Sequence, residues 1–205
     1  MDWEVRHALN YETLLTAAGG SEAKAGEAFD RAKELLDINE PFDRNYGEYA
    51  RLLDRDIAAV RQAYEENVRA FGTLEGKVWI INRDSPLWPR QVSMFAYIPR
   101  FLYVQGDVNL LKQPIVSVIG TRSPSLEGRK LAYQSSLALA KGNFVVASGL
   151  ALGIDAIAHK SVLSEGEKTI AVIGTPLNQT YPAEHKELQQ IIGEQGAVVS
   201  RFGPA

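Results

Sequence analysis

The chain has 205 residues, a formal net charge of −3 and no cysteine, so it can bury one hydrophobic core with at most a small appended domain. The lack of cysteine excludes thiol catalysis, cysteine-ligated zinc and disulfides. Residues 1–20 carry charges without a long apolar block, and no run approaches the length of a membrane span, so we expect a cytoplasmic protein that makes no membrane contact.

Residues 1–75 are predicted to form a small all-α domain. A helix is expected after the start signal at 19–21, closed by Pro41. Residues 50–71 indicate another, because apolar side chains recur every three or four positions. They are Leu53, Ile57, Val60, Tyr64, Val68 and Phe71. Charges fill the opposite faces, and residues 1–99 hold 12 Lys and Arg against 17 Asp and Glu, so we expect solvated surfaces here.

Residues 76–205 are predicted to form an α/β domain. Two short strands are expected at 77–82 and 100–104, separated by a proline-rich connection. Strands and helices then alternate, with strands near 115–119, 144–147, 169–173 and 197–200 and helices near 125–141, 154–164 and 183–195. This alternation predicts a parallel sheet with helices on both faces. The first of these strands shows no polar alternation, so we expect it to be buried on both faces.

A turn at residues 120–123 follows that strand, where open α/β sheets bind ligands. Gly120 permits close backbone approach, and Thr121 and Ser123 offer hydroxyls near the start of a helix. Arg122 is suited to holding a phosphate with two hydrogen bonds. The same residues also fit a plain tight turn with a surface arginine, and both interpretations stay open.

The next strand leads into residues 148–159, SGLALGIDAIAH. Gly149 and Gly153 flank a turn that needs unusual backbone angles or close contact. Asp155 lies in the first helical turn, and because a carboxylate repels phosphate we interpret it as a structural brace of the loop. His159 shares a helical face with Asp155, but pairs of this kind are usually structural, so we do not expect acid–base catalysis from it.

A third connection, residues 174–182, contains one aromatic residue, Tyr181, which either stacks on a base or plugs the loop. The chain lacks the dinucleotide-binding glycine pattern, a Walker lysine, a nucleophile elbow and a metal-spaced histidine cluster. We therefore expect no cofactor, no metal and no enzymatic activity.

Taken together, the motifs at 120–122, 148–159, 169–188 and 196–200 resemble those of the DprA/Smf family of DNA-processing proteins. The lead-in sequences SPLWPRQV and PRFLYVQGD match the family as well, so the resemblance covers about residues 77–205. It implies an extended Rossmann domain that binds single-stranded DNA without catalysis, protects it, and helps to load the RecA recombinase during natural transformation.

The resemblance also implies which residues contact DNA. The backbone grip corresponds to Gly120, Thr121 and Arg122, to which the turn adds Ser123. The second loop corresponds to Ser148, Gly149, Leu150, Ala151 and Gly153, and the pocket-forming loop to Gly174, Thr175 and Tyr181.

Several features depart from the family pattern. The family continues into an Arg-Asn-Arg segment, whereas this sequence stops at Ala205, and Leu152 supplies no cation. The first 75 residues lack a helix-hairpin-helix signature, so we expect scaffolding or protein contact from them.

The alternative function is a sensor of a nucleotide or phosphorylated metabolite. A phosphoribohydrolase is disfavoured because its Pro-Gly-Gly loop is missing.

The resemblance implies a homodimer formed by the Rossmann-like domain. The sequence suggests where its subunits would meet, because residues 197–200 would end the sheet with an apolar strand that no later segment covers. An uncovered strand edge favours pairing with another chain.

Overall fold

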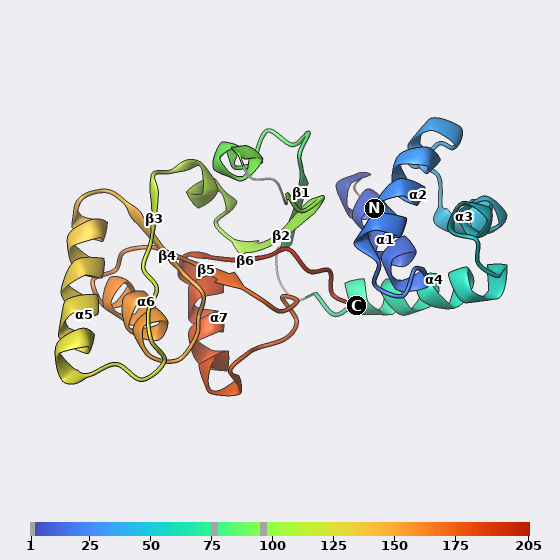
Figure 1. The fold of residues 1–205 in the computed structure, drawn as a ribbon. Coiled ribbons are helices and arrows are strands. Elements are labelled where there is room, and N and C mark those ends of the chain that lie inside the picture. Colours follow the sequence, from blue (N-terminus) through green and yellow to red (C-terminus); the bar gives the residue numbers. More distant parts are fainter. Residues whose placement is uncertain (1–2, 75–77, 95–97) are drawn as a thin grey trace. The chain divides into compact units, whose positions relative to one another are not determined.

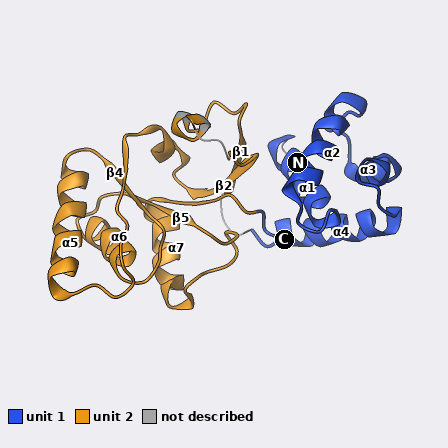
Figure 2. Ribbon diagram, viewed as in Figure 1, with its two compact units in different colours: residues 1–74, 203–205 blue, residues 75–202 orange. Residues whose placement is uncertain are grey.

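The computed structural model describes residues 3–74, 78–94 and 98–205 (Figure 1). The chain forms two compact units: Met1–Leu74 with Gly203–Ala205, and Glu75–Phe202 (Figure 2). The last three residues therefore group with the helices, which differs from the expected division at residue 75. Lys77 of the first predicted strand lies outside the described residues.

The first unit is helical, as expected, and contains α1 (Trp3–Ala17), α2 (Glu22–Leu35), α3 (Tyr46–Leu53) and α4 (Ile57–Phe71). The side chain of Ser21 accepts a hydrogen bond from the amide of Lys24 and so caps α2. The single helix predicted over 50–71 is wrong. Asp54 adopts a left-handed conformation with φ of 52°, which ends α3, and α4 begins only at Ile57.

The second unit contains, in its described residues, six strands and three α-helices. The strands are β1 (Val78–Asn82), β2 (Phe101–Gly106), β3 (Ile115–Ser117), β4 (Val145–Ser148), β5 (Thr169–Ile173) and β6 (Ala197–Ser200). The helices are α5 (Leu126–Lys141), α6 (Ile154–Ser164) and α7 (Lys186–Gln195). The predicted α/β class and the alternation from β3 to β6 are confirmed.

The sheet is mixed rather than wholly parallel, with the strand order β1-β2-β6-β5-β4-β3. Strands β3 to β6 are parallel, but β2 pairs antiparallel with both β1 and β6. The expectation that the outer edge of residues 197–200 is open is therefore wrong, since β2 covers that edge. The earlier segment folds back into the sheet, and the outer strand at the other end is β3.

Helices α5, α6 and α7 pack on one face of the sheet, which corrects the expected two-sided cover (Figure 1). Val146 of β4 packs against α5 and α6. Gly193 of α7 lies against the side chain of Gln105, which points away from the face that its neighbour Val104 occupies. The cause is the strand order: successive steps from β3 to β6 run in one direction, so right-handed crossovers place every helix on the same side.

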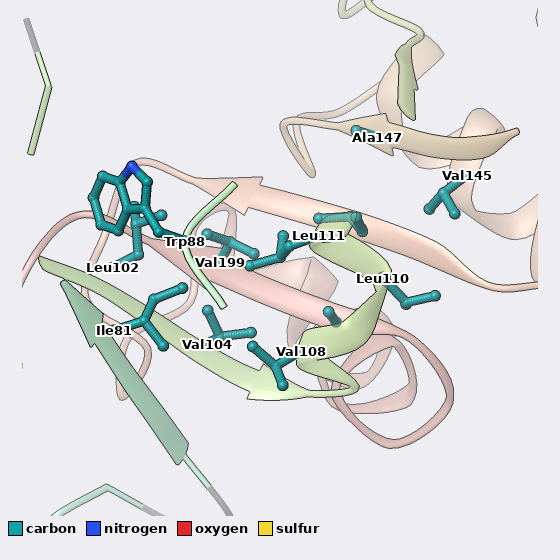
Figure 3. Packing of buried hydrophobic residues seen from close by; sticks show 12 residues of the cluster. Ile81, Trp88, Leu102, Val104, Val108, Leu110, Leu111, Val145, Ala147 and Val199 are labelled. Carbon is teal, nitrogen blue, oxygen red and sulfur yellow. The ribbon is translucent and has the colours of Figure 1, made fainter. Parts of the chain in front are cut away.

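The other face is covered by the chain between β1 and β3, which includes the short 3-10 helix η3 (Val108–Lys112). Trp88, Leu110 and Leu111 pack there against strand residues such as Val104 and Val199 (Figure 3). This cluster stabilises the strands that carry the loops at the carboxyl end of the sheet.

Strand β3 is not buried on both faces, as its apolar sequence had predicted. Ile115 and Val116 are half-buried, Ser117 is exposed, and Ile119 just after the strand is 75% exposed. The reason is its place at the end of the sheet, where no described strand lies against its outer edge.

Candidate functional site

The carboxyl ends of β3, β4 and β5 meet at one edge of the sheet because these strands are parallel. Three connections leave this edge, which we name loop A (residues 118–125), loop B (residues 149–153) and loop C (residues 174–185). Together they form the loop rim. All of the predicted site residues lie in the loop rim except Ser148, the last residue of β4, and the predicted brace Asp155, in the first turn of α6.

Loop A exposes all four predicted residues, 120 to 123. The hydroxyl of Thr121 accepts a hydrogen bond of 3.2 Å from the amide of Ser123, which shapes the turn. The hydroxyl of Ser125 caps α5 by accepting from the amide of Gly128 at 3.1 Å. Arg122 has no hydrogen-bond or ion-pair partner among the described residues, so its guanidinium is available to a ligand.

A second arginine, which sequence reasoning missed, lies beside loop A. Arg129 is in the first turns of α5, and its Nε donates to the carbonyl of Pro124 at 3.4 Å. The sequence held one signal for it: Arg129 follows the helix cap Ser125 by four residues, which places both on the same side of the helix. The exposed side chain places a second cation near Arg122 in sequence and near loop A in space.

Loop B is held from inside by Asp155. The buried carboxylate accepts hydrogen bonds from the amides of Gly149 at 3.1 Å and Ala151 at 3.4 Å. A Cβ atom on Gly149 would lie 2.9 Å from that carboxylate, so a glycine is needed there. Between the two amides, Leu150 adopts a left-handed conformation with φ of 61°, and its side chain is fully buried.

Loops A and B touch through two glycines. Gly153 has φ of 82°, and a Cβ atom on it would lie 2.3 Å from the carbonyl oxygen of Thr121. The same carbonyl accepts a hydrogen bond from the amide of Ile154 at 3.1 Å. A Cβ atom on Gly120 would lie 2.6 Å from the side chain of Ile154, so both glycines permit the contact.

Loop C is anchored by side chains beneath it. Ser200 donates to the carbonyl of Thr175 at 2.7 Å, and Gln189 donates to the carbonyls of Leu177 and Gln179 at 3.3 and 3.2 Å. Tyr181 is 64% exposed, so it is not the buried plug that was one of its two interpretations. Gly174 is exposed and has open space around its Cα, as judged by the position of a Cβ atom.

Two predicted contact residues have buried side chains. The hydroxyl of Ser148 donates to the carbonyl of Val118 at 2.6 Å, and the side chain of Leu150 is fully buried. Both residues are buried and position the backbone of the loop rim from inside.

The hydrogen bonds of the loop rim reduce the negative charge that its backbone presents to a ligand. Internal donors engage many of its carbonyl oxygens, among them those of Val118, Thr121, Pro124, Leu150, Thr175, Leu177 and Gln179. Engaged carbonyls present less negative charge to a ligand, while Arg122 adds positive charge. Residues 75–202 hold 13 Lys and Arg against 10 Asp and Glu, so the loop rim is suited to an anion.

His159 lies under the loop rim and is fully buried. Its Nδ1 is 2.8 Å from the hydroxyl of Thr169, which itself donates to the carbonyl of Val146, so Nδ1 carries the proton. Burial lowers the pKa of His159 to about 4, against a smaller opposing effect of the Asp155 carboxylate. A neutral, buried imidazole is poorly placed for proton transfer to a ligand on the surface.

Neither a metal centre nor a membrane span is found in the described parts of the chain. No group of three or more His, Cys, Asp or Glu side chains there is arranged to hold a metal ion. No helix there combines the length and the apolar character that crossing a bilayer requires.

The fold and the loop rim define an α/β protein whose predicted ligand edge lies at the carboxyl ends of its parallel strands. The family model of DNA recombination-mediator protein A matches residues 79–205. The chain therefore belongs to this family, the DprA/Smf proteins, and the predicted resemblance is confirmed.

Relatives of known name support the assignment. The DNA processing protein DprA of Streptococcus pneumoniae is 42% identical over 117 residues, which are 57% of this chain and 41% of that protein. Protein Smf of Escherichia coli is 36% identical over 124 residues, which are 60% of this chain and 33% of that protein. This chain thus aligns with less than half of the length of these two relatives.

Two solved structures are similar. DNA processing protein A from Streptococcus pneumoniae has a TM-score of 0.70 at 31% identity and covers 96% of this chain and 68% of its own. DNA processing protein A from Helicobacter pylori has a TM-score of 0.54 at 30% identity, covering 62% of this chain and 56% of its own. The Helicobacter pylori structure addresses a single-stranded DNA binding mode of that protein.

Proposed function

We propose that this chain binds single-stranded DNA through the loop rim, without catalysis, as part of DNA processing. The observation that carries the proposal is the arrangement of loop A, where the exposed Arg122 stands beside Thr121 and Ser123 at the start of α5. Backbone amides, hydroxyls and arginine at such a position favour phosphate. The single-stranded DNA binding mode of the Helicobacter pylori relative supports the choice of ligand.

Base contacts come from the exposed apolar side chains of the same edge. Tyr181 is 64% exposed and Leu152 is 42% exposed, and an aromatic ring can stack on any base. The proposed site combines these with the backbone groups of Gly149, Ala151 and Gly153. Because the faces of the bases are accessible for stacking only in an unpaired strand, this combination favours single-stranded over duplex DNA.

Binding without catalysis is proposed because Asp155 and His159, the titratable pair under loop B, have structural roles. Asp155 accepts two loop amides, which supports its proposed role as a brace, and His159 is buried and neutral. The role of the complex would be to protect the strand and to transfer it to a RecA-type recombinase during natural transformation in the cytoplasm.

A homodimer is also proposed. Because β2 covers β6, the strand that favours self-association is β3, the outer strand of the sheet. This strand ends near the exposed Ile119. An apolar outer strand favours pairing with a second copy.

The test is a fluorescence-polarisation titration with a labelled oligonucleotide in single-stranded and duplex form. We expect tighter binding of the single strand, weakened by salt, and poor competition by a mononucleotide. Equal affinity for both forms, or no binding below ~100 µM, the weak end of non-specific DNA affinity, would contradict the proposal. Full competition by a mononucleotide would favour the sensor function instead.

A further inference from the structure

The backbone of loop B is held in an unfavourable conformation at Leu150. A left-handed φ of 61° is uncommon for a leucine, and residues of this kind persist only where the surroundings fix them. Three hydrogen bonds do so: Asp155 accepts from the amides on either side of Leu150, and a third bond engages the carbonyl of Leu150 itself. Loop B therefore depends on the donor of that third bond.

The donor is His185, which comes from loop C. Its Nδ1 lies 2.8 Å from the carbonyl oxygen of Leu150, and the side chain is buried. A carbonyl oxygen only accepts, so Nδ1 carries the proton and donates. Sequence reasoning gave this histidine no role, since its partner lies 35 residues earlier.

The bond connects loops B and C, while Gly153 and Ile154 connect loops A and B. The three loops are thereby linked in one series. A carbonyl that lost its donor would be left buried without a partner, or the backbone of Leu150 would rotate to reach water. Either change alters the spacing of loop B from loop C.

We propose that His185 is a positioning residue for DNA binding: its Nδ1–H holds loop B at a fixed distance from loop C before the ligand arrives. This inference rests on the proposed function of the loop rim. A site that is already ordered loses less conformational freedom on binding, which raises its affinity. His185 acts through the loop backbone and does not need to touch the DNA.

Two substitutions separate the hydrogen bond from the imidazole ring. His185→Asn keeps an N–H donor at the same number of bonds from the main chain, whereas His185→Leu removes it and keeps the site apolar. His159→Leu is the matched control, because His159 is also a buried histidine whose Nδ1 makes a hydrogen bond. That bond goes to Thr169 of the sheet and not to a loop of the rim.

We expect His185→Leu to raise the Kd for single-stranded DNA about fivefold, the equivalent of one neutral hydrogen bond of ~1 kcal/mol. His185→Asn should stay within about twofold of the wild type, since the donor is kept. The salt dependence should not change in either variant, because no phosphate contact is lost. His159→Leu should lower Tm and leave the Kd near that of the wild type.

Wild-type affinity in His185→Leu would overturn the inference. So would an equal loss in His185→Asn, which would assign the effect to the ring, or an equal loss in His159→Leu, which would assign it to general stability. Hydrogen exchange of the free protein tests the positioning role of His185 separately from DNA binding by the loop rim. His185→Leu should speed amide exchange at residues 149–151 more than His159→Leu does, whether or not the wild type binds DNA; equal exchange overturns the positioning role.

Discussion

Replacing Gly153 by alanine should separate loops A and B. Gly153 has φ of 82° and ψ of −124°, a combination that side-chain-bearing residues rarely adopt. The added Cβ atom would lie 2.3 Å from the carbonyl oxygen of Thr121 and 2.7 Å from the carbonyl carbon of Arg122. Both neighbours are backbone atoms, so the contact is relieved only by moving one loop away from the other.

The expected loss of stability follows from these contacts. Backbone strain at such a position costs about 1–3 kcal/mol. Moving loop A also weakens the hydrogen bond from the amide of Ile154 to Thr121, worth ~1 kcal/mol. We therefore expect Gly153→Ala to lower the free energy of unfolding by about 3 kcal/mol and to raise the Kd for single-stranded DNA by about tenfold.

Gly166→Ala is the matched control for this substitution. Gly166 lies in the same unit with φ of 75°, but a Cβ atom on it would meet nothing within 4 Å. It should cost about 1 kcal/mol and leave DNA binding unchanged. Urea denaturation and fluorescence polarisation measure both quantities. Equal losses of stability in the two variants, with equal Kd values, would refute the argument that Gly153 joins the loops.

Two further predictions concern charge. Because burial lowers the pKa of His159 from 6.5 to about 4, the unfolded chain takes up its proton first as the pH falls. The free energy of unfolding should thus decrease between pH 6.5 and 4, by up to ~3 kcal/mol, and His159→Asn should reduce this dependence in urea denaturation; an identical dependence would contradict it. Arg122→Ala should weaken DNA binding and reduce the slope of log Kd against log salt by about one, without changing Tm. Lys141→Ala, at the far end of α5, should keep the slope, and an unchanged slope in Arg122→Ala would make that arginine a plain surface charge.

Much of the second unit could be predicted because its signals are local. Each parallel strand is a short apolar run that ends at, or just before, glycine or serine, and an α-helix follows each of β3, β4 and β5 before the next strand begins. The predicted bounds of α6, β5 and β6 therefore agree with the structure. The three loops followed from the same pattern, since parallel strands bring their carboxyl ends to one edge.

The features that were predicted wrongly or missed depend on contacts between distant segments or on competing local conformations. The pairing of β2 with β6 joins Tyr103 to Ser200, and no periodicity encodes it. The one-sided arrangement of the helices depends on strand order, which pairing decides. In the first unit, apolar spacing predicted one helix across Asp54, where a left-handed residue separates two. The bond from His185 to Leu150 was missed for the same reason as the strand pairing.

Binding of single-stranded DNA by the three loops of the rim can be tested by hydrogen exchange of the full chain, followed by mass spectrometry, with and without an excess of a single-stranded oligonucleotide. We predict slower amide exchange in residues 118–125, 149–153 and 174–185 on binding, and little change in residues 3–74. Protection confined to the helical unit, or unchanged exchange in all three loops while DNA is bound, would contradict the claim.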